Sequence, residues 1–489
     1  MASSHCFSWV SSCAYSGAPG ARNVRQAALS SRIGSGLEGV RHHRGRGSPR
    51  EDVDHRDRFE SPAFMRSVRE WIAVAFLLSL VSPMLSYIGH GLKLSWPLYG
   101  IWLVLMYCGR PQTFAKVIAE VRRRSIECFM PMVWWYIILL NILFSRGLTG
   151  GVHLVSCTTW LMVLFMEVSL AAQYDGSNRR IAIKGIILIA AECLWSFPHM
   201  LAMPTLARMR MSHPSDYAAE ASLAGIGEYS YYTALAMFVP ILLGLGVSVR
   251  SRLSRLLYLV LVVGVAVTVS LATFMGAALL MACGGALFVV LSWSHSRTRR
   301  SSWGLIVLVA IAVLVWQTSL SHTAQGSFIA NKVALEIKSI RATGIENEPT
   351  GRGQLNLLSI ASIERSPLIG VGPYTLTYNP GLYVLVGGHS SWLDQPAEYG
   401  LLGFLPVAAF LLLRTLRALR SVRSKSPTNE AVAHLVTLIV YIAGGTLNAV
   451  LFFHPIMVVV FMLAPGVVPM STEYQPAIAN SSVTAEKRG

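Results

Sequence analysis

About twelve segments of this chain are apolar for long enough to cross a bilayer as helices, which need about 20 mostly apolar residues. They lie near 71–89, 92–108, 126–144, 152–172, 181–198, 229–249, 256–274, 276–293, 303–320, 397–413, 431–451 and 453–470. Two long apolar stretches are each divided at a glycine or proline, at Gly276 and at His454-Pro455. The pattern predicts an all-α polytopic membrane protein.

The composition agrees with this fold class. Of the 489 residues, 53% are hydrophobic and 13% are charged, whereas a soluble protein has about 25% charged residues. The net charge of +17 indicates cytoplasmic loops beside anionic lipid. It does not indicate nucleic-acid binding, because the chain has no basic, aromatic soluble domain. The seven cysteines form no Cys-x-x-Cys or Cys/His cluster, so neither a disulfide framework nor a metal site is expected.

Basic residues alternate between the loops in a way that predicts the topology. With the N-terminus in the cytoplasm, the short outside loops carry only Lys93, Arg146, Arg208 and Arg210. The inside loops carry most of the remaining arginines, including Arg122–Arg124, Arg297–Arg300 and Arg414–Arg423. This asymmetry predicts that both ends of the chain are cytoplasmic and that the number of spans is even.

The predicted organisation has five parts. Residues 1–64 are a basic disordered tail, or belong to an over-long gene model whose true start is Met65, or form a transit peptide. Residues 65–320 form the membrane domain with spans 1–9, and 397–470 carry spans 10–12. Between them, 321–396 is a large extracytoplasmic loop with the candidate site, and 471–489 is a cytoplasmic tail.

The large loop contains an arginine suited to phosphate binding. Arg352 lies between Gly351 and Gly353, which allow the backbone to approach a bulky anion. A guanidinium group pairs with phosphate oxygens and stays charged at any working pH. Further along, Ser366 to Gly372 reads Ser-Pro-Leu-Ile-Gly-Val-Gly, which predicts a tight structural turn that packs the loop onto the membrane domain.

His389 lies just before a predicted helix start. Ser391 and Asp394 have the spacing of a capping box. A helix N-terminus favours a nearby diphosphate, and a histidine there can take a proton from a sugar hydroxyl near neutral pH. Glu398 follows where this helix enters the bilayer, and a carboxylate at that depth is costly unless it is paired. Glu167 and Glu192 inside predicted spans are either functional or paired with a buried hydroxyl or amide.

These motifs, in this order, resemble the signature of the O-antigen ligase and O-antigen polymerase superfamily. The matching residues are Thr350-Gly351-Arg352, then Ser366 to Gly372, then His389 with Trp392, then Glu398-Tyr399-Gly400-Leu401-Leu402-Gly403. The resemblance implies a metal-independent glycosyltransferase of the bacterial inner membrane with a periplasmic active site. Its donor would be a glycan on undecaprenyl diphosphate, and its acceptor a saccharide or lipid A-core. A polysaccharide chain-length protein is a possible partner.

The resemblance also implies roles for individual residues. His389 would act as the base or orient the acceptor, Arg352 would stabilise the departing diphosphate, and Glu398 would orient His389 or an arginine. Tyr399 follows Glu398 in the same motif, and Tyr231 lies where a cavity-lining helix opens in the family; both are candidate substrate contacts, although Tyr231 also fits an interfacial aromatic belt.

The chain departs from the family pattern at two points. The family commonly has a Ser-Arg-Gly near the outer end of the seventh–eighth hairpin, where this chain has Thr273-Phe274-Met275-Gly276. Either another cation replaces that arginine, or the substrate or activity differs; the candidate cations are Arg208, Arg210, Lys332, Lys338 and Arg341. The residue after the histidine is Ser390 where the family often has Asn.

Two other functions are alternatives. A twelve-span chain with both ends inside fits a two-half transporter, although such carriers usually place their long loop inside the cell. A non-catalytic membrane partner of polysaccharide assembly would explain the missing arginine. The motifs do not distinguish a polymerase from a ligase.

Overall fold

The computed structural model describes residues 62–469 with gaps. The gaps are 89–91, 109, 145–150, 204–205, 213, 273, 294–330, 332–333, 335–337, 339–351, 373–375, 380–381, 386–389, 425–426 and 449. Contacts divide the chain into two units, Met1–Val68 and Arg69–Gly489. Residues 62–68, the first turns of a helix, are the described part of the first unit.

The described chain is almost entirely helical. The helices are α3 Pro62–Val81, α4 Pro83–Ile88, α5 Leu92–Tyr107, α6 Pro111–Arg123, α7 Ser125–Phe144, α8 Gly151–Ala171, α9 Ser177–Ala202, α10 Leu206–Ser212, α11 Pro214–Leu223, α12 Tyr229–Ser248, α13 Arg252–Leu271, α14 Met275–Trp293, α17 Arg352–Arg365, α18 Ser391–Val422, α19 Asn429–Leu447, η4 Val450–Phe452, α20 His454–Val458, η5 Val459–Leu463 and α21 Ala464–Val467. Two strands, β1 Leu376–Asn379 and β2 Leu382–Leu385, form a hairpin that the sequence pattern did not predict.

Eight described helices are long and apolar enough to cross a membrane: α7, α8, α9, α12, α13, α14, α18 and α19. Each coincides with a predicted span. The predicted segments near 71–89, 92–108 and 453–470 fall on shorter or broken helices, and 303–320 lies outside the described residues. The prediction of an all-α polytopic membrane protein is therefore confirmed in its coarser form, while the count of twelve stays a prediction.

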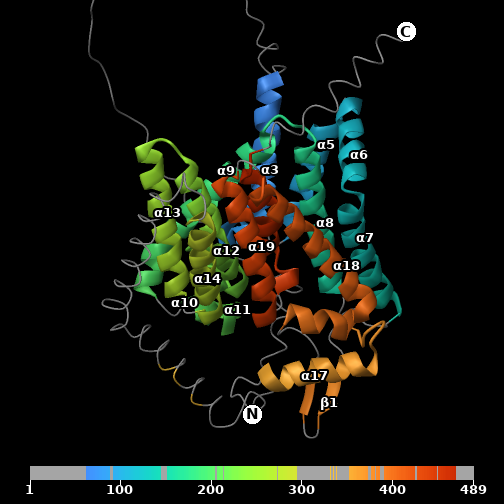
Figure 1. Ribbon diagram of the computed structural model, residues 1–489. Helices are drawn as coiled ribbons and strands as arrows, with labels where there is room; N and C mark the ends of the chain where they lie inside the picture. The colour runs from blue at the N-terminus through green and yellow to red at the C-terminus, as the bar shows by residue number, and fades with distance from the viewer. Residues whose placement is uncertain are drawn as a thin grey trace, which may run out of the picture. The chain divides into compact units, whose positions relative to one another are not determined.

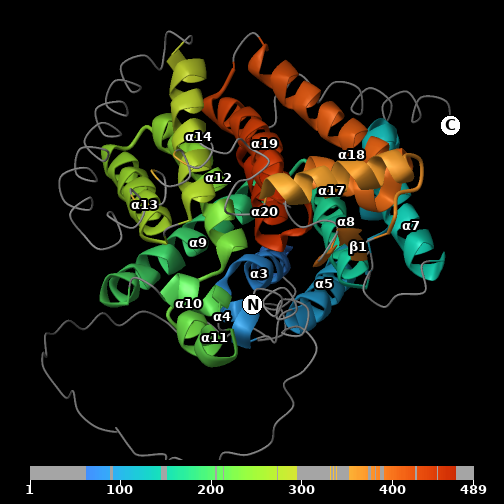
Figure 2. The same cartoon turned by 90° about the horizontal axis from the view of Figure 1, so that it is seen from below.

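Helix α12 forms the centre of the second unit. It packs against α13, α14 and α19, as both views of the ribbon show (Figure 1, Figure 2), and its side chains from Tyr231 to Leu245 are buried. By contrast, α7 and α13 expose apolar residues such as Phe129, Met132 and Leu256. In a membrane such faces contact lipid, because lipid tails are as apolar as these side chains.

Ion pairs gather at one end of the second unit. They join α3 to the α8–α9 turn and to the start of α9, and they join α9 to the start of α19. The pairs are Arg69–Asp175 at 3.7 Å, Glu70–Arg180 and Glu70–Lys184 at 2.7 Å, and Arg179–Glu430 at 3.3 Å. The opposite end carries α10, α11, α17 and β1 (Figure 1). The described parts of the predicted outside loop 321–396 and of the segment with Arg208 and Arg210 are thus found at the same end.

Candidate functional site

Helix α18 breaks at Gly400, near the end that carries α17. Gly400 has φ 65° and ψ −174°, which is not helical, so the helix loses its own hydrogen bonds there. The turn at Pro367–Gly372 replaces them with four backbone hydrogen bonds. They are Leu401 N–H to Pro367 O at 2.8 Å, Leu402 N–H to Leu368 O at 3.1 Å, Val371 N–H to Ala397 O at 2.9 Å and Gly372 N–H to Glu398 O at 2.9 Å. We call this joint the clasp.

The clasp requires glycine at two positions. Gly370 and Gly400 both have positive φ, 73° and 65°, a region that costs other L-residues about 1–2 kcal/mol. A Cβ at Gly370 would overlap the backbone of Glu398, and one at Gly400 would overlap the backbone of Leu368. The predicted tight turn that packs the loop onto the membrane domain is therefore confirmed.

The start of α18 differs from the prediction by one residue. The N-cap is Ser390, not Ser391, and Asp394 Oδ2 accepts the Ser390 backbone N–H at 2.9 Å. Asp394 thus reaches back to the helix start as predicted, while the hydroxyl of Ser391 donates to Asn448 O at 3.2 Å, at the end of α19. Neither serine side chain caps the helix: the Ser390 hydroxyl donates to Gly445 O at 3.3 Å and the Ser391 hydroxyl to Asn448 O, contacts with a distant helix that a local motif does not reveal.

A buried polar cluster lies directly before the helix break. Glu398 is 2% exposed and His153, near the start of α8, is 7% exposed. Nδ1 of His153 is 2.7 Å from the hydroxyl of Tyr399 and 3.5 Å from Oε2 of Glu398. Within the described residues, no hydrogen bond reaches that Oε2 atom. Glu398 therefore lies beside a histidine from a helix about 245 residues earlier.

Aromatic contacts fix the imidazole ring of His153. Phe452 in η4 stacks on it with ring centroids 4.1 Å apart and an interplanar angle of 12°. Trp134 of α7 stacks on Phe452 in turn, with centroids 5.5 Å apart. Its indole N–H donates to Gln395 Oε1 at 3.0 Å, which ties the stack back to α18. Sequence analysis missed His153, whose only signal is an imidazole near the end of an apolar span.

The structure places the backbone of some predicted site residues without describing their side chains. Arg352 is the first residue of α17, and Arg208 lies in α10. His389 and Arg341 lie outside the described residues. Helix α17 contacts the start of α18, where the Ser359 hydroxyl donates to Asp394 Oδ1 at 3.4 Å. Arg352 therefore begins the helix that packs on the segment following His389.

Arg210 and Tyr231 are found in a separate region around the start of α12. Arg210 donates to Ile226 O and lies 3.6 Å from Glu228, so its charge is partly engaged within the chain. Tyr231 is 2% exposed, and it packs edge-on against Tyr232 with ring centroids 5.4 Å apart. It is a buried side chain rather than a member of the interfacial aromatic belt that was one of its predicted roles.

Glu167 and Glu192 both have partners in the chain. Glu192 accepts hydrogen bonds from the Ser82 hydroxyl at 2.7 Å and the Met84 backbone at 3.2 Å, which fits the predicted pairing with a hydroxyl. Glu167 instead pairs with arginines, Arg124 at 2.9 Å and Arg414 at 2.8 Å. Charge compensation therefore explains Glu167 without a catalytic role.

Glu167 belongs to a larger network at the arginine-rich end of α18. Arg414 also pairs with Glu127, and Arg124 also pairs with Glu120. Burial alone would lower the pKa of Arg124, but the carboxylates of Glu167 and Glu120 outweigh that effect and raise it. We call Glu120, Arg123, Arg124, Glu127, Glu167, Arg414 and Arg417 the arginine network. It joins α6, α7, α8 and α18.

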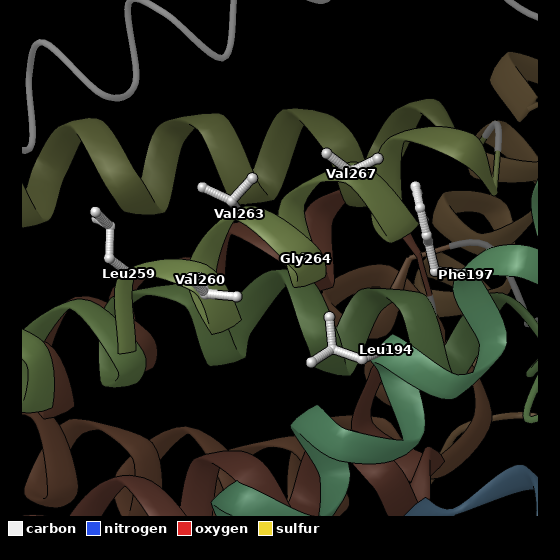
Figure 3. A pocket seen from close by; sticks show the side chains of 7 residues that line it. All are labelled: Leu194, Phe197, Leu259, Val260, Val263, Gly264 and Val267. Carbon is white, nitrogen blue, oxygen red and sulfur yellow. The ribbon is translucent and has the colours of Figure 1, made fainter. Parts of the chain in front are cut away.

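One apolar groove of about 320 Å³ lies between α9 and α13, away from both polar regions. Figure 3 shows its lining side chains, which are Leu194, Phe197, Leu259, Val260, Val263 and Val267 together with Gly264. None of them can serve as an acid, a base or an anion ligand, so the groove contributes no chemistry to the candidate site.

Within the described part of the chain, no three His, Cys, Asp or Glu side chains are placed to hold a metal ion. No protein-family model matches this chain, and no curated protein matches it at a significant level.

Proposed function

We propose that this chain is a membrane glycosyltransferase of the O-antigen ligase or polymerase type. It would move a glycan from undecaprenyl diphosphate onto a saccharide or lipid A-core acceptor during surface polysaccharide synthesis. The membrane would be the bacterial inner membrane, and the reaction would occur on its periplasmic side.

The clasp is the observation that carries this proposal. It ties the Pro367–Gly372 turn to the break in α18, so that the loop following Arg352 is joined to the buried Glu398. Ser390, the neighbour of His389 in the chain, hydrogen-bonds Asp394 one turn before Glu398. This arrangement supports a shared site, because the turn is joined to the Glu398 segment and α17, which begins at Arg352, packs against α18.

The proposed chemistry follows from the residue types. The acceptor hydroxyl attacks the anomeric carbon of the donor, and the bond from that carbon to the diphosphate oxygen breaks. His389 takes the proton from the hydroxyl. Arg352, the first described residue of α17, stabilises the negative charge on the departing diphosphate.

Deletion of the gene in its host is the first test, read from surface glycolipids on a silver-stained gel. A ladder that collapses to core plus one repeat identifies a polymerase. Loss of all glycan from the core, with accumulation of lipid-linked polymer, identifies a ligase. An unchanged pattern contradicts a role in lipopolysaccharide assembly and favours exopolysaccharide synthesis or transport.

Substitutions then test the residue roles in the same assay. His389→Ala and Arg352→Ala should each lower glycan transfer by about 100-fold or more while the protein still inserts in the membrane. Two matched controls should keep activity: His199→Ala, an exposed histidine at the end of α9, and Arg365→Ala, an exposed arginine at the other end of α17. Full activity of His389→Ala would exclude its catalytic role.

A further inference from the structure

His153 and Glu398 form an unusual buried pair, because their contact is close without being a good hydrogen bond. Nδ1 of His153 is 3.5 Å from Oε2 of Glu398, beyond the usual 2.7–3.2 Å range. The same nitrogen is 2.7 Å from the Tyr399 hydroxyl. Elsewhere, the buried Glu127, Glu167 and Glu430 each contact an arginine. Glu398 instead contacts a histidine, whose charge is optional.

Two proton arrangements satisfy this geometry. In the first, the Tyr399 hydroxyl donates to Nδ1 of a neutral His153, and Glu398 is a neutral carboxylic acid. In the second, the proton lies on Nδ1 of His153, which then faces both the Tyr399 oxygen and an ionised Glu398. Each arrangement has zero net charge, and a single proton moving between Oε2 and Nδ1 converts one into the other. The orientation of the Tyr399 hydroxyl must reverse at the same time.

The first arrangement suits the resting protein better. Two opposite charges in a buried site are stabilised only when close, well-aligned hydrogen bonds offset the loss of water. The contact between Nδ1 and Oε2 is too long for that, whereas the Tyr399–His153 contact has normal hydrogen-bond length. Phe452 stacked on the imidazole keeps water from one face of the ring.

We propose that His153, Tyr399 and Glu398 form a proton-holding site in which Glu398 carries the proton at rest and His153 is the positioning residue that can receive it. The site deepens the proposed function and rests on it for its role: it would adjust the charge at Glu398 while the acceptor hydroxyl loses its proton. No step requires an oxidant, a metal or a further reactant, since the proton remains within the pair.

Infrared spectroscopy of the purified full-length protein tests the site without any substrate. A protonated carboxyl group gives a C=O stretching band that an ionised carboxylate lacks. We expect such a band at neutral pH, its loss in Glu398→Gln, and a shift of its position in Tyr399→Phe and in His153→Gln. Glu192→Gln removes another buried acid and serves as the matched control, which should leave this band in place.

The possible results distinguish failure of the proton-holding site from failure of the proposed function. Absence of the band, or its loss only in Glu192→Gln, would overturn the proton-holding site whatever the enzyme does. If the band behaves as expected, His153→Gln should also lower glycan transfer by about tenfold or more. A band that behaves as expected with unchanged transfer would refute the positioning role of His153. An unchanged glycan pattern in the gene deletion would contradict a role in lipopolysaccharide assembly and leave the proton-holding site intact.

Discussion

The buried acids at the two ends of α18 have different kinds of partner. At one end, Arg414 pairs with Glu127 and Glu167, and both carboxylates are held by fixed positive charges. At the other end, Glu398 contacts His153 and the helix is broken at Gly400. An arginine stays charged at any working pH, whereas a histidine can gain or lose a proton. The first end is built to hold helices together, and the second keeps a group that can change its charge.

The largest effect should come from breaking the arginine network. Arg414→Ala removes the shared partner of Glu127 and Glu167 and leaves each with one arginine, Arg417 and Arg124 respectively, so the loss should approach the value of about 3–5 kcal/mol for a broken buried pair. Thermal unfolding in detergent, followed by size-exclusion chromatography, measures the loss. Arg420→Ala is the control, because Arg420 is exposed on the same helix and should change stability by less than about 0.5 kcal/mol. Equal stability of both variants would show that the network does not hold the helices together.

Disrupting the clasp at the other end of α18 should lower stability less than Arg414→Ala does, but it should lower glycan transfer more. Gly400→Ala places a Cβ against the Leu368 backbone at a positive φ, so the clasp must open at a cost of at least about 1–2 kcal/mol. Glycan transfer should fall with it, because the loop loses its attachment beside Glu398.

A control glycine shows whether the loss of stability is specific to the clasp or follows from any Gly→Ala change in a helix. Gly285 in α14 has open space where a Cβ would lie, so Gly285→Ala should be neutral or slightly stabilising. If Gly400→Ala unfolds at the same temperature as Gly285→Ala, the clasp is not a structural requirement.

The pH dependence of stability tests whether the carboxylates of the arginine network contribute to folding. Burial alone would raise the pKa of Glu120, but hydrogen bonds and charge from Arg123 and Arg124 outweigh it and lower the pKa below 4.5. The carboxylate therefore contributes stability above about pH 4.5 that is lost as the pH falls through the lower folded-state value. Thermal stability measured from pH 6 to pH 3 should fall less steeply in Glu120→Gln than in the natural protein. Identical pH profiles would exclude this contribution.

The smallest effect is expected at the pair Arg179–Glu430, whose charges are 3.3 Å apart and in which only the carboxylate is buried. The Arg179 side chain is 45% exposed, and Glu430 lies in the first turn of α19, where the helix dipole stabilises a negative charge. Arg179→Ala should therefore cost no more than about 1 kcal/mol. A loss as large as that of Arg414→Ala, in the same unfolding assay, would mean that exposure does not explain the difference between the two pairs.

Much of the helical framework could be predicted from the sequence. The predicted span 229–249 is α12, Tyr229–Ser248, and 276–293 is α14, Met275–Trp293. Apolar segments of this length in a bilayer must form helices, since no water is present to satisfy their backbone groups. The turn at Pro367–Gly372 was also predictable, because its proline restricts backbone angles and its two glycines permit unusual ones.

The candidate site was only partly predictable, because local patterns do not show which distant residues a side chain contacts. Motif order singled out Glu398 and Tyr399, and the structure places both beside the helix break. The hairpin β1–β2 and the shift of the helix cap from Ser391 to Ser390 left no clear local signal. At the helix start, the deciding contact joins segments far apart in the sequence, because the Ser391 hydroxyl bonds to Asn448 O.

The sequence by itself determined that this protein is a helical membrane protein and which residues carry unusual chemistry for such a setting. Hydropathy and turn preferences act over a few residues, so they can be read along the chain. Only the tertiary structure decided the partners of the buried acids, arginines for Glu167 and His153 for Glu398. Those partners depend on how each helix is rotated about its axis and packed against its neighbours, which the apolar pattern of a membrane span leaves open.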